Sequence, residues 1–205
     1  MAELLLIRHG KTAGNLLGRY IGSRTDEPLC DEGREELAGK QLPEVERLYV
    51  SPMKRCVETA EILWPGFDRK KMQKVTDLRE CDFGDFENKN YKELSGNGDY
   101  QAWIDSNGTL PFPNGESMDA FKSRCLEAFA RIVEDVSGAE QEWIASGKTG
   151  IFRAGIVVHG GTIMAILEQY GYPKAAYFDY QVKNGCGYRL TPVEGTRLWN
   201  CLCLQ

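Results

Sequence analysis

Near the start of the chain, residues 4–10 read LLLIRHG. Residues 4–7 form an apolar run of the length expected for a buried strand, and Gly10 ends that run at once. His9 therefore stands just beyond the C-terminal end of a predicted strand. Residues 156–161 read IVVHGG and repeat the arrangement, with His159 beyond a second buried strand.

The chain contains two histidines, and both occupy this kind of position. In open parallel sheets, ligands bind in the crevice outside the carboxyl ends of the strands, so both imidazoles can face one crevice. A glycine follows each histidine, and its missing Cβ lets backbone N–H groups approach an anion. Thr162 then begins a predicted helix whose N-terminus favours a phosphate. A single histidine at a strand end is more commonly a turn residue than a catalytic one. With two such histidines, the two interpretations are about equally supported.

Two arginines accompany the histidines. Arg8 precedes His9 directly, and a guanidinium at the end of a buried strand is costly unless it binds an anion. Its planar fork matches phosphate oxygens. Arg55 lies one turn into a helix predicted to follow a strand over residues 47–50, which places it near the same rim. Taken alone, Arg55 is more commonly a surface arginine.

The remaining hydrophobic pattern alternates between the two kinds of element. Strands are predicted over residues 4–7, 47–50, 72–76, 155–158, 188–190 and 198–204. Helices are predicted over 31–42, from Pro52 to 63, over 116–144 and over 162–170. This alternation predicts an α/β fold with a doubly wound, mostly parallel sheet, as a single three-layer α/β/α domain over residues 1–205. Residues 82–115, rich in glycine, asparagine and aromatic residues, are predicted to pass over the active site.

Bulk properties exclude several functions. The 205 residues carry a net charge of −5 with acidic and basic residues mixed, which disfavours binding to nucleic acids or to anionic membranes. The first apolar run is too short for a signal peptide, and no run approaches the roughly 20 apolar residues that span a bilayer. Seven scattered cysteines without a secretory signal predict free thiols in a cytoplasmic protein.

Five segments carry a resemblance to a known family: residues 6–10, 51–60, 78–84, 115–117 and 158–161. Their motifs are LIRHG, SPxxRxxxTA, LRE followed by FG, GES and VHGG, in this order. With them the chain resembles the histidine phosphatase superfamily, branch 1, the phosphoglycerate mutase-like branch. The resemblance implies a phosphoglycerate mutase-like fold, a small phosphorylated metabolite as substrate, and a phosphohistidine mechanism without metal or other cofactor. We expect a monomer or a homodimer.

The resemblance also implies roles for individual residues. His9 attacks phosphorus, His159 assists catalysis by holding the phosphoryl oxygens, and Glu80 is the general acid and then the base. Further matches are the phosphate-binding residues Arg8, Asn15, Arg55 and Gly160 and the substrate-binding residues Thr12, Ile21 and Gly22. Attack requires a neutral His9, whose pKa two guanidinium groups should lower, whereas the pKa of Glu80 should be raised. Asp82, Asp85 and Glu87 are rivals for the acid role.

Within the family, residues 78–87 are most similar to phosphatase members, especially those acting on α-ribazole-5'-phosphate in cobalamin assembly. Phe86 and Asn88 stand where those members commonly carry tryptophan and glycine. Phe83, Phe86 and Trp103, with the acidic residues of 82–87, favour a partly apolar leaving group over a small, doubly acidic ligand. The alternatives are a cofactor-dependent phosphoglycerate mutase, a non-catalytic protein that binds phosphorylated ligands, and a metallohydrolase. Arg8 disfavours the last, because it would repel a divalent cation.

Overall fold

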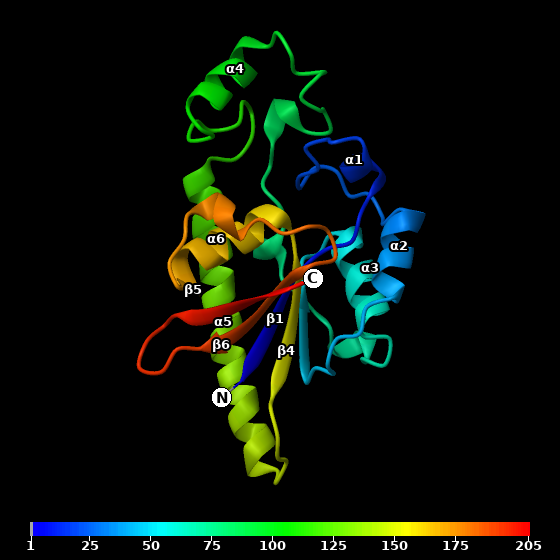
Figure 1. Cartoon of the computed structure of the whole chain (residues 1–205), viewed down its shortest axis with the longest axis vertical. Coiled ribbons are helices and arrows are strands. Elements are labelled where there is room, and N and C mark those ends of the chain that lie inside the picture. Colours follow the sequence, from blue (N-terminus) through cyan, green and yellow to red (C-terminus); the bar gives the residue numbers. More distant parts are fainter. Residues whose placement is uncertain (1) are drawn as a thin grey trace.

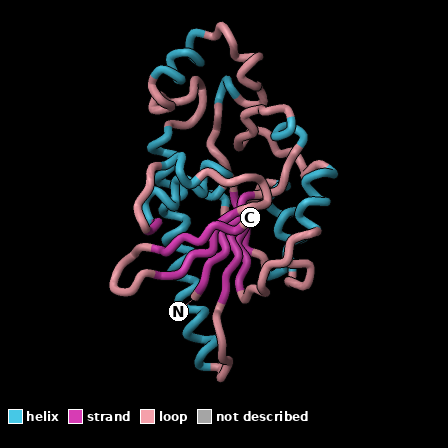
Figure 2. Tube along the Cα trace, viewed as in Figure 1, coloured by secondary structure: helices cyan, strands magenta, loops and turns pink. Residues whose placement is uncertain are grey.

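The computed structural model describes residues 2–205, which are organised around a seven-stranded sheet of order β3-β2-β4-β1-β6-β7-β5 (Figures 1 and 2). The strands are β1 (Glu3–Arg8), β2 (Arg47–Val50), β3 (Gln73–Lys74), β4 (Arg153–Val158), β5 (Gly171–Tyr172), β6 (Gly187–Pro192) and β7 (Trp199–Leu204). The α-helices are α1 (Ala13–Leu16), α2 (Asp31–Ala38), α3 (Lys54–Leu63), α4 (Gly98–Asp105), α5 (Met118–Ala145) and α6 (Gly160–Tyr170). Short 3-10 helices are η1 (Arg69–Lys71), η2 (Thr76–Leu78), η3 (Gly84–Phe86) and η4 (Tyr177–Tyr180).

The direction of the strands confirms the predicted α/β fold with a mostly parallel sheet. Strands β3, β2, β4 and β1 run parallel, whereas β6 is antiparallel to both β1 and β7. The register sets Arg8 of β1 opposite Val158 of β4. The residues that follow these two strands, His9 and His159, therefore emerge side by side at one edge of the sheet.

Helices cover both faces of the sheet, with α5 and α6 on one face and α2 and α3 on the other (Figure 1). Alternate residues of β1 serve the two cores: Leu4 and Leu6 join the cluster beneath α5 and α6, while Leu5 and Ile7 join the cluster beneath α2 and α3. A strand buried on both faces has no polar side, which explains the unbroken apolar run.

Residues 82–115, which include α4, extend beyond the edge of the sheet near α1 (Figure 1). Their apolar side chains share a small core with Phe121 and Cys125 of α5 and Ala165 of α6. Phe86, Leu94 and Phe112 are buried there, and Trp103 packs against them. The Phe86 ring is fully buried and lies 5.4 to 6.2 Å, centroid to centroid, from neighbouring rings. Phe86 therefore stabilises this segment, and the expectation that it favours an apolar leaving group by lying near it is wrong.

Four predicted helix boundaries are also wrong. Helix α5 begins at Met118, two residues later than predicted, with Ser117 as its N-cap. Helix α3 begins at Lys54, not at Pro52, because the preceding Ser51 still pairs with β4 by donating its N–H to the Val157 carbonyl. Helix α6 begins two residues earlier than predicted, so that His159 is its N-cap. Helix α2 ends at Ala38 instead of continuing to residue 42.

Over residues 2–205, every helix is too short or too polar to cross a bilayer.

Candidate active site

The two histidines meet at the carboxyl edge of the sheet. His9 is 4% exposed and His159 is fully buried, and their ring centroids lie 5.2 Å apart with the planes at 65°. The His9 N–H donates to the Val158 carbonyl at 2.9 Å, which continues the ladder between β1 and β4 beyond the strands. The sheet itself thus sets the distance between the imidazoles.

Hydrogen bonding fixes the tautomer of His9. Its Nδ1 lies 2.7 Å from the carbonyl oxygen of Gly10, and because a carbonyl can only accept, Nδ1 carries the proton. The Nε2 lone pair is then free to act as a nucleophile. Burial, and to a lesser degree the charges of Arg55 and Arg8, hold the pKa of His9 well below its usual value. His9 is therefore neutral at neutral pH, as attack on phosphorus requires.

His159 has the opposite tautomer. Its Nδ1 accepts from the Arg55 Nε–H at 3.3 Å, and because a guanidinium can only donate, the imidazole proton lies on Nε2. Nε2 lies 2.7 Å from the Ser51 hydroxyl and donates to it. Burial and then the charge of Arg55 hold the pKa of His159 well below its usual value. The role of Ser51 was not predicted, although its place at the head of the SPxxR motif could have indicated it.

Two guanidinium groups give the site its positive charge. Arg55, which by itself suggested a surface residue, is fully buried and donates to the Thr25 carbonyl at 2.8 Å and to the Gly22 carbonyl at 3.0 Å. Arg8 donates from Nη1 to the Val182 carbonyl at 2.7 Å, while its buried Nε has no hydrogen-bond partner among residues 2–205.

Within the same residues neither arginine forms a salt bridge, and no three histidine, cysteine or carboxylate side chains are placed to hold a metal ion. Buried cations without a carboxylate partner are costly, and an anionic ligand offsets that cost. The buried, unpartnered Nε–H of Arg8 is a donor that such a ligand can use.

Glu80 is a further buried residue of the site and is 7% exposed. Its carboxylate accepts from the Cys81 N–H at 3.0 Å and from the Gly161 N–H at 3.2 Å. A Cβ on Gly161 would lie only 2.6 Å from Oε1 of Glu80, so a side chain at this position would displace the Glu80 carboxylate. Burial raises the pKa of Glu80, although both N–H groups and the charges of Arg55 and Arg8 oppose the shift. The carboxyl group thus keeps its proton to a higher pH than an exposed glutamate does.

The three rival carboxylates are engaged elsewhere. Asp82 pairs with Arg24 at 2.7 Å, and Glu87 accepts from the Gly22 N–H at 2.9 Å. Asp85 is exposed and accepts from the Asn114 side chain at 2.8 Å. Of the four carboxylates between residues 80 and 87, Glu80 alone is buried.

Asn15 and Gly160, predicted to bind phosphate, lie at the same edge. The side-chain oxygen of Asn15 accepts from the Thr12 N–H at 3.2 Å and from the Asn184 amide at 3.1 Å. Because this oxygen is already engaged, the Asn15 side chain can offer its amide N–H groups to an anion. Gly160 opens α6, and a Cβ there would lie 3.4 Å from the Arg8 guanidinium carbon.

The three predicted substrate-binding residues are held by the protein itself. Thr12 is fully buried, and its hydroxyl caps α1 by accepting from the Asn15 N–H. The Ile21 side chain is buried as well. Both backbone groups of Gly22 are hydrogen-bonded, because its N–H donates to Glu87 and its carbonyl accepts from Arg55. Contacts of these three with substrate stay predictions.

Two further residues of the site were missed. The Asn184 amide donates to the His9 carbonyl at 3.1 Å, from 175 positions along the chain, and an Asn-Gly pair in sequence signals no more than a turn. Arg124 donates to the Glu80 carbonyl at 3.0 Å from within α5, where its helical spacing suggests an ordinary exposed residue.

Comparisons with known proteins agree with this geometry. The model of the histidine phosphatase superfamily (branch 1) matches residues 4–203. Phosphoglycerate mutase-like protein 4 of Arabidopsis thaliana is 30% identical over 82% of this chain and 70% of that protein. The adenosylcobalamin/alpha-ribazole phosphatase of Salmonella typhimurium is 27% identical over 94% of this chain and 92% of that protein. The crystal structure of a putative alpha-ribazole-5'-P phosphatase from Escherichia coli shares the fold, with a TM-score of 0.80, 22% identity, and coverage of 100% and 96%. Because the family model spans nearly the whole chain, this protein belongs to branch 1 of the histidine phosphatase superfamily.

Proposed function

We propose that the chain hydrolyses phosphomonoesters through a phosphohistidine formed on His9. The observation that carries the proposal is the tautomer of His9, whose Nδ1–H is bound to the Gly10 carbonyl so that Nε2 keeps its lone pair. This neutral imidazole lies 5.2 Å, centroid to centroid, from His159, and the half-buried Arg8 and the fully buried Arg55 form no salt bridge with a carboxylate among the described residues. A nucleophile beside unpaired cations suits a phosphate ester.

The residues divide the reaction into two steps. In the first, Nε2 of His9 forms a bond to phosphorus while the bond from phosphorus to the ester oxygen breaks, and Glu80 gives its proton to that oxygen. In the second, the Glu80 carboxylate takes a proton from water, whose oxygen attacks phosphorus and releases phosphate and neutral His9. Arg8, Arg55 and His159 stabilise the charge on the phosphoryl oxygens in both steps, which is the main source of the acceleration.

Hydrolysis is favoured over a mutase reaction by the state of Arg24. A mutase substrate carries a second acidic group, which needs a cation beyond the phosphate clamp. Arg24 belongs to the same loop as Gly22, but its guanidinium is engaged by the Asp82 carboxylate at 2.7 Å and by the Asn114 carbonyl. It is therefore not free to bind a second anion.

For the leaving group we propose a nucleoside-like alcohol, with α-ribazole-5'-phosphate as the candidate substrate. The support is the similarity of residues 78–87 to α-ribazole phosphatases and the kinship with the Salmonella enzyme. Phe86 no longer contributes to this proposal, whereas Phe83 and Trp103 are partly exposed and can face a ligand.

A substrate panel tests the proposal. Phosphate release is measured from α-ribazole-5'-phosphate, p-nitrophenyl phosphate and 3-phosphoglycerate, with and without a chelator, beside a coupled mutase assay primed with the bisphosphate. We expect the highest kcat/KM for α-ribazole-5'-phosphate and an acid-labile label on His9 after quenching. Mutase turnover well above the rate of phosphate release, or label on a serine, cysteine or aspartate, would contradict the proposal.

A further inference from the structure

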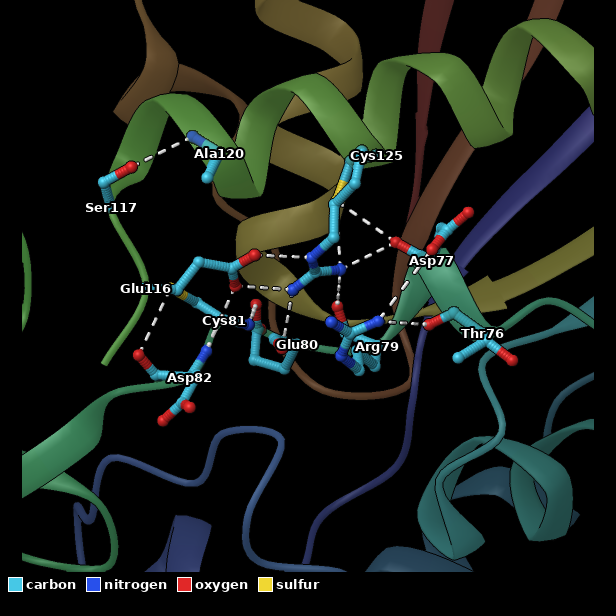
Figure 3. A network of polar contacts seen from close by, with 11 residues as sticks. Thr76, Asp77, Arg79, Glu80, Cys81, Asp82, Glu116, Ser117, Ala120 and Cys125 are labelled. Atoms are coloured by element: carbon cyan, nitrogen blue, oxygen red, sulfur yellow. Dashed lines mark hydrogen bonds and ion pairs between the residues drawn. The ribbon is translucent and has the colours of Figure 1, made fainter. Parts of the chain in front are cut away.

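The GES motif at residues 115–117 lies outside the catalytic pocket, and its parts have different roles. Ser117 caps α5, accepting from the Ala120 N–H at 3.2 Å. Glu116 faces Arg124, and the two side chains form a double hydrogen bond at 2.7 and 2.8 Å (Figure 3). The side chains are only 14% and 12% exposed, so solvent screens this pair less than a surface salt bridge.

Arg124 uses all of its hydrogen-bonding capacity. A guanidinium has five N–H donors in a fixed plane. Two of them serve Glu116, and the other three donate to the backbone carbonyls of Asp77 at 2.7 Å, Arg79 at 2.7 Å and Glu80 at 3.0 Å (Figure 3). Few side chains can hold three carbonyls of one short segment, and lysine, with three donors around a point charge, cannot reproduce the planar arrangement.

The segment held in this way has no regular structure to support it. Residues 79–83 lie between η2 and η3 and belong to neither helix nor strand. Glu116 holds the segment beyond Glu80, because its carboxylate accepts from the Asp82 N–H at 3.3 Å and its backbone N–H donates to the Asp82 carbonyl at 2.9 Å. The Glu116 and Arg124 pair thus fixes the backbone on both sides of the Glu80 side chain.

We propose that Arg124, together with Glu116, is the positioning residue for the general acid, an inference that rests on the proposed role of Glu80. Arg124 contacts the backbone carbonyl of Glu80 and not its carboxylate, and the charge of Glu116 offsets its own. Its effect on the reaction is therefore geometric. General-acid catalysis needs the acid within hydrogen-bond reach of the leaving oxygen, and displacements of about 1 Å are costly.

The leaving group of the substrate separates this role from a general loss of structure. Alkyl phosphates need a proton on the departing oxygen, whereas p-nitrophenyl phosphate expels a stabilised phenolate and needs little help. We expect Glu80→Gln to lower kcat for an alkyl phosphate by about 100-fold or more and kcat for p-nitrophenyl phosphate far less. Arg124→Met should show the same selectivity, with a loss of about 10- to 100-fold on the alkyl ester, and Arg124→Lys should recover part of it.

A matched control lies on the same helix. Arg131 pairs with the Asp77 carboxylate at 2.7 Å, so it contacts the same segment, but at the exposed surface and away from Glu80. Arg131→Met should leave both substrates unchanged. A double variant, Glu80→Gln with Arg124→Met, should be no slower on the alkyl ester than Glu80→Gln alone, because the positioned group is already absent.

The outcomes distinguish the two proposals. If Glu80→Gln slows both esters equally, the acid role in the proposed function is wrong. If Glu80→Gln is selective but Arg124→Met slows both esters equally, or if the losses in the double variant multiply, the positioning role is wrong. Should Arg124→Met fail to fold, Glu116→Gln supplies the test. It keeps the volume of the side chain and weakens the pair of hydrogen bonds to Arg124. A selective loss in Glu116→Gln supports the proposal, and an equal loss on both esters overturns it.

Discussion

The pocket at the strand ends and the covering segment of residues 82–115 are built by different means. The pocket inherits its geometry from the sheet, since His9 and His159 directly follow the adjacent strands β1 and β4 and the ladder continues through the His9 N–H. The covering segment is held by an aromatic cluster and by individual side-chain bonds such as those of Glu116. Under the proposed function, the sheet therefore supplies the site for the phosphate, while side chains that can vary independently shape the site for the leaving group.

The two regions also differ in whether their arginines are paired with carboxylates. In the pocket, Arg8 and Arg55 have no carboxylate partner within residues 2–205, so their charge is available to a ligand. In and around the covering segment, arginines are paired: Arg24 with Asp82, and Arg124 with Glu116. Of these four arginines, the two in the pocket are thus the ones without a carboxylate ion pair among residues 2–205, which under the proposed function favours binding of the phosphoryl group there.

The largest effect is expected in the pocket. His9→Ala removes the nucleophile, and no other side chain there can form the phosphoenzyme, so phosphate release should fall by at least about 1,000-fold on every ester. Quenched-flow labelling should detect no phosphoenzyme. The variant should still gain thermal stability from inorganic phosphate, because Arg8 and Arg55 remain. Residual turnover above a tenth of the wild-type rate would show that His9 is not the nucleophile.

A smaller effect is expected in the covering segment, where an arginine can be released from its carboxylate partner. Asp82→Asn releases Arg24 from its partner, and a partly exposed ion pair of this kind is worth about 0.2 to 1 kcal/mol. We expect KM for 3-phosphoglycerate to fall by at most about fivefold, with no change for p-nitrophenyl phosphate. Asp85→Asn, at the exposed rim, is the control. An unchanged KM for 3-phosphoglycerate in Asp82→Asn would mean that Arg24 cannot reach the substrate.

The smallest effect concerns stability and pH. Unfolded histidines bind a proton below about pH 6.5, whereas burial keeps His9 and His159 neutral in the folded protein to a lower pH. The unfolded state therefore binds more protons, and the free energy of unfolding should fall as pH drops from 7 towards 5. Glu80, whose pKa is raised by burial, opposes this trend, so the measurement is made in a Glu80→Gln background.

Because the chain has two histidines, the double variant His9→Asn with His159→Gln removes both titrations at once. Urea unfolding at pH 5, 6 and 7 should then give a flatter dependence than the histidine-containing background. An unchanged slope would assign the pH dependence to groups outside the pocket.

The sequence by itself was sufficient for the fold class and for placing His9 and His159 together at the carboxyl ends of two strands. Runs such as LLLI and IVV are apolar at every position because strands of a parallel sheet are covered on both faces, and that pattern needs no partner to be recognised. The histidine and glycine after each run then lie at the carboxyl edge, where ligands bind. Helix boundaries were less predictable, since pairing with a neighbouring strand kept Ser51 in the sheet and delayed the start of α3.

Tertiary structure decided how those residues act. The tautomers of His9 and His159 depend on the Gly10 carbonyl, Ser51 and Arg55, and the burial of Arg55 depends on carbonyls of the loop near Gly22. The same holds for the placement of Glu80 by Arg124. A hydrophobic period tells which face of an element is buried, but it does not name the polar partner that a buried group will meet. Those partners lie up to 175 positions apart, as Asn184 does from His9, and only the folded chain brings them within hydrogen-bonding distance.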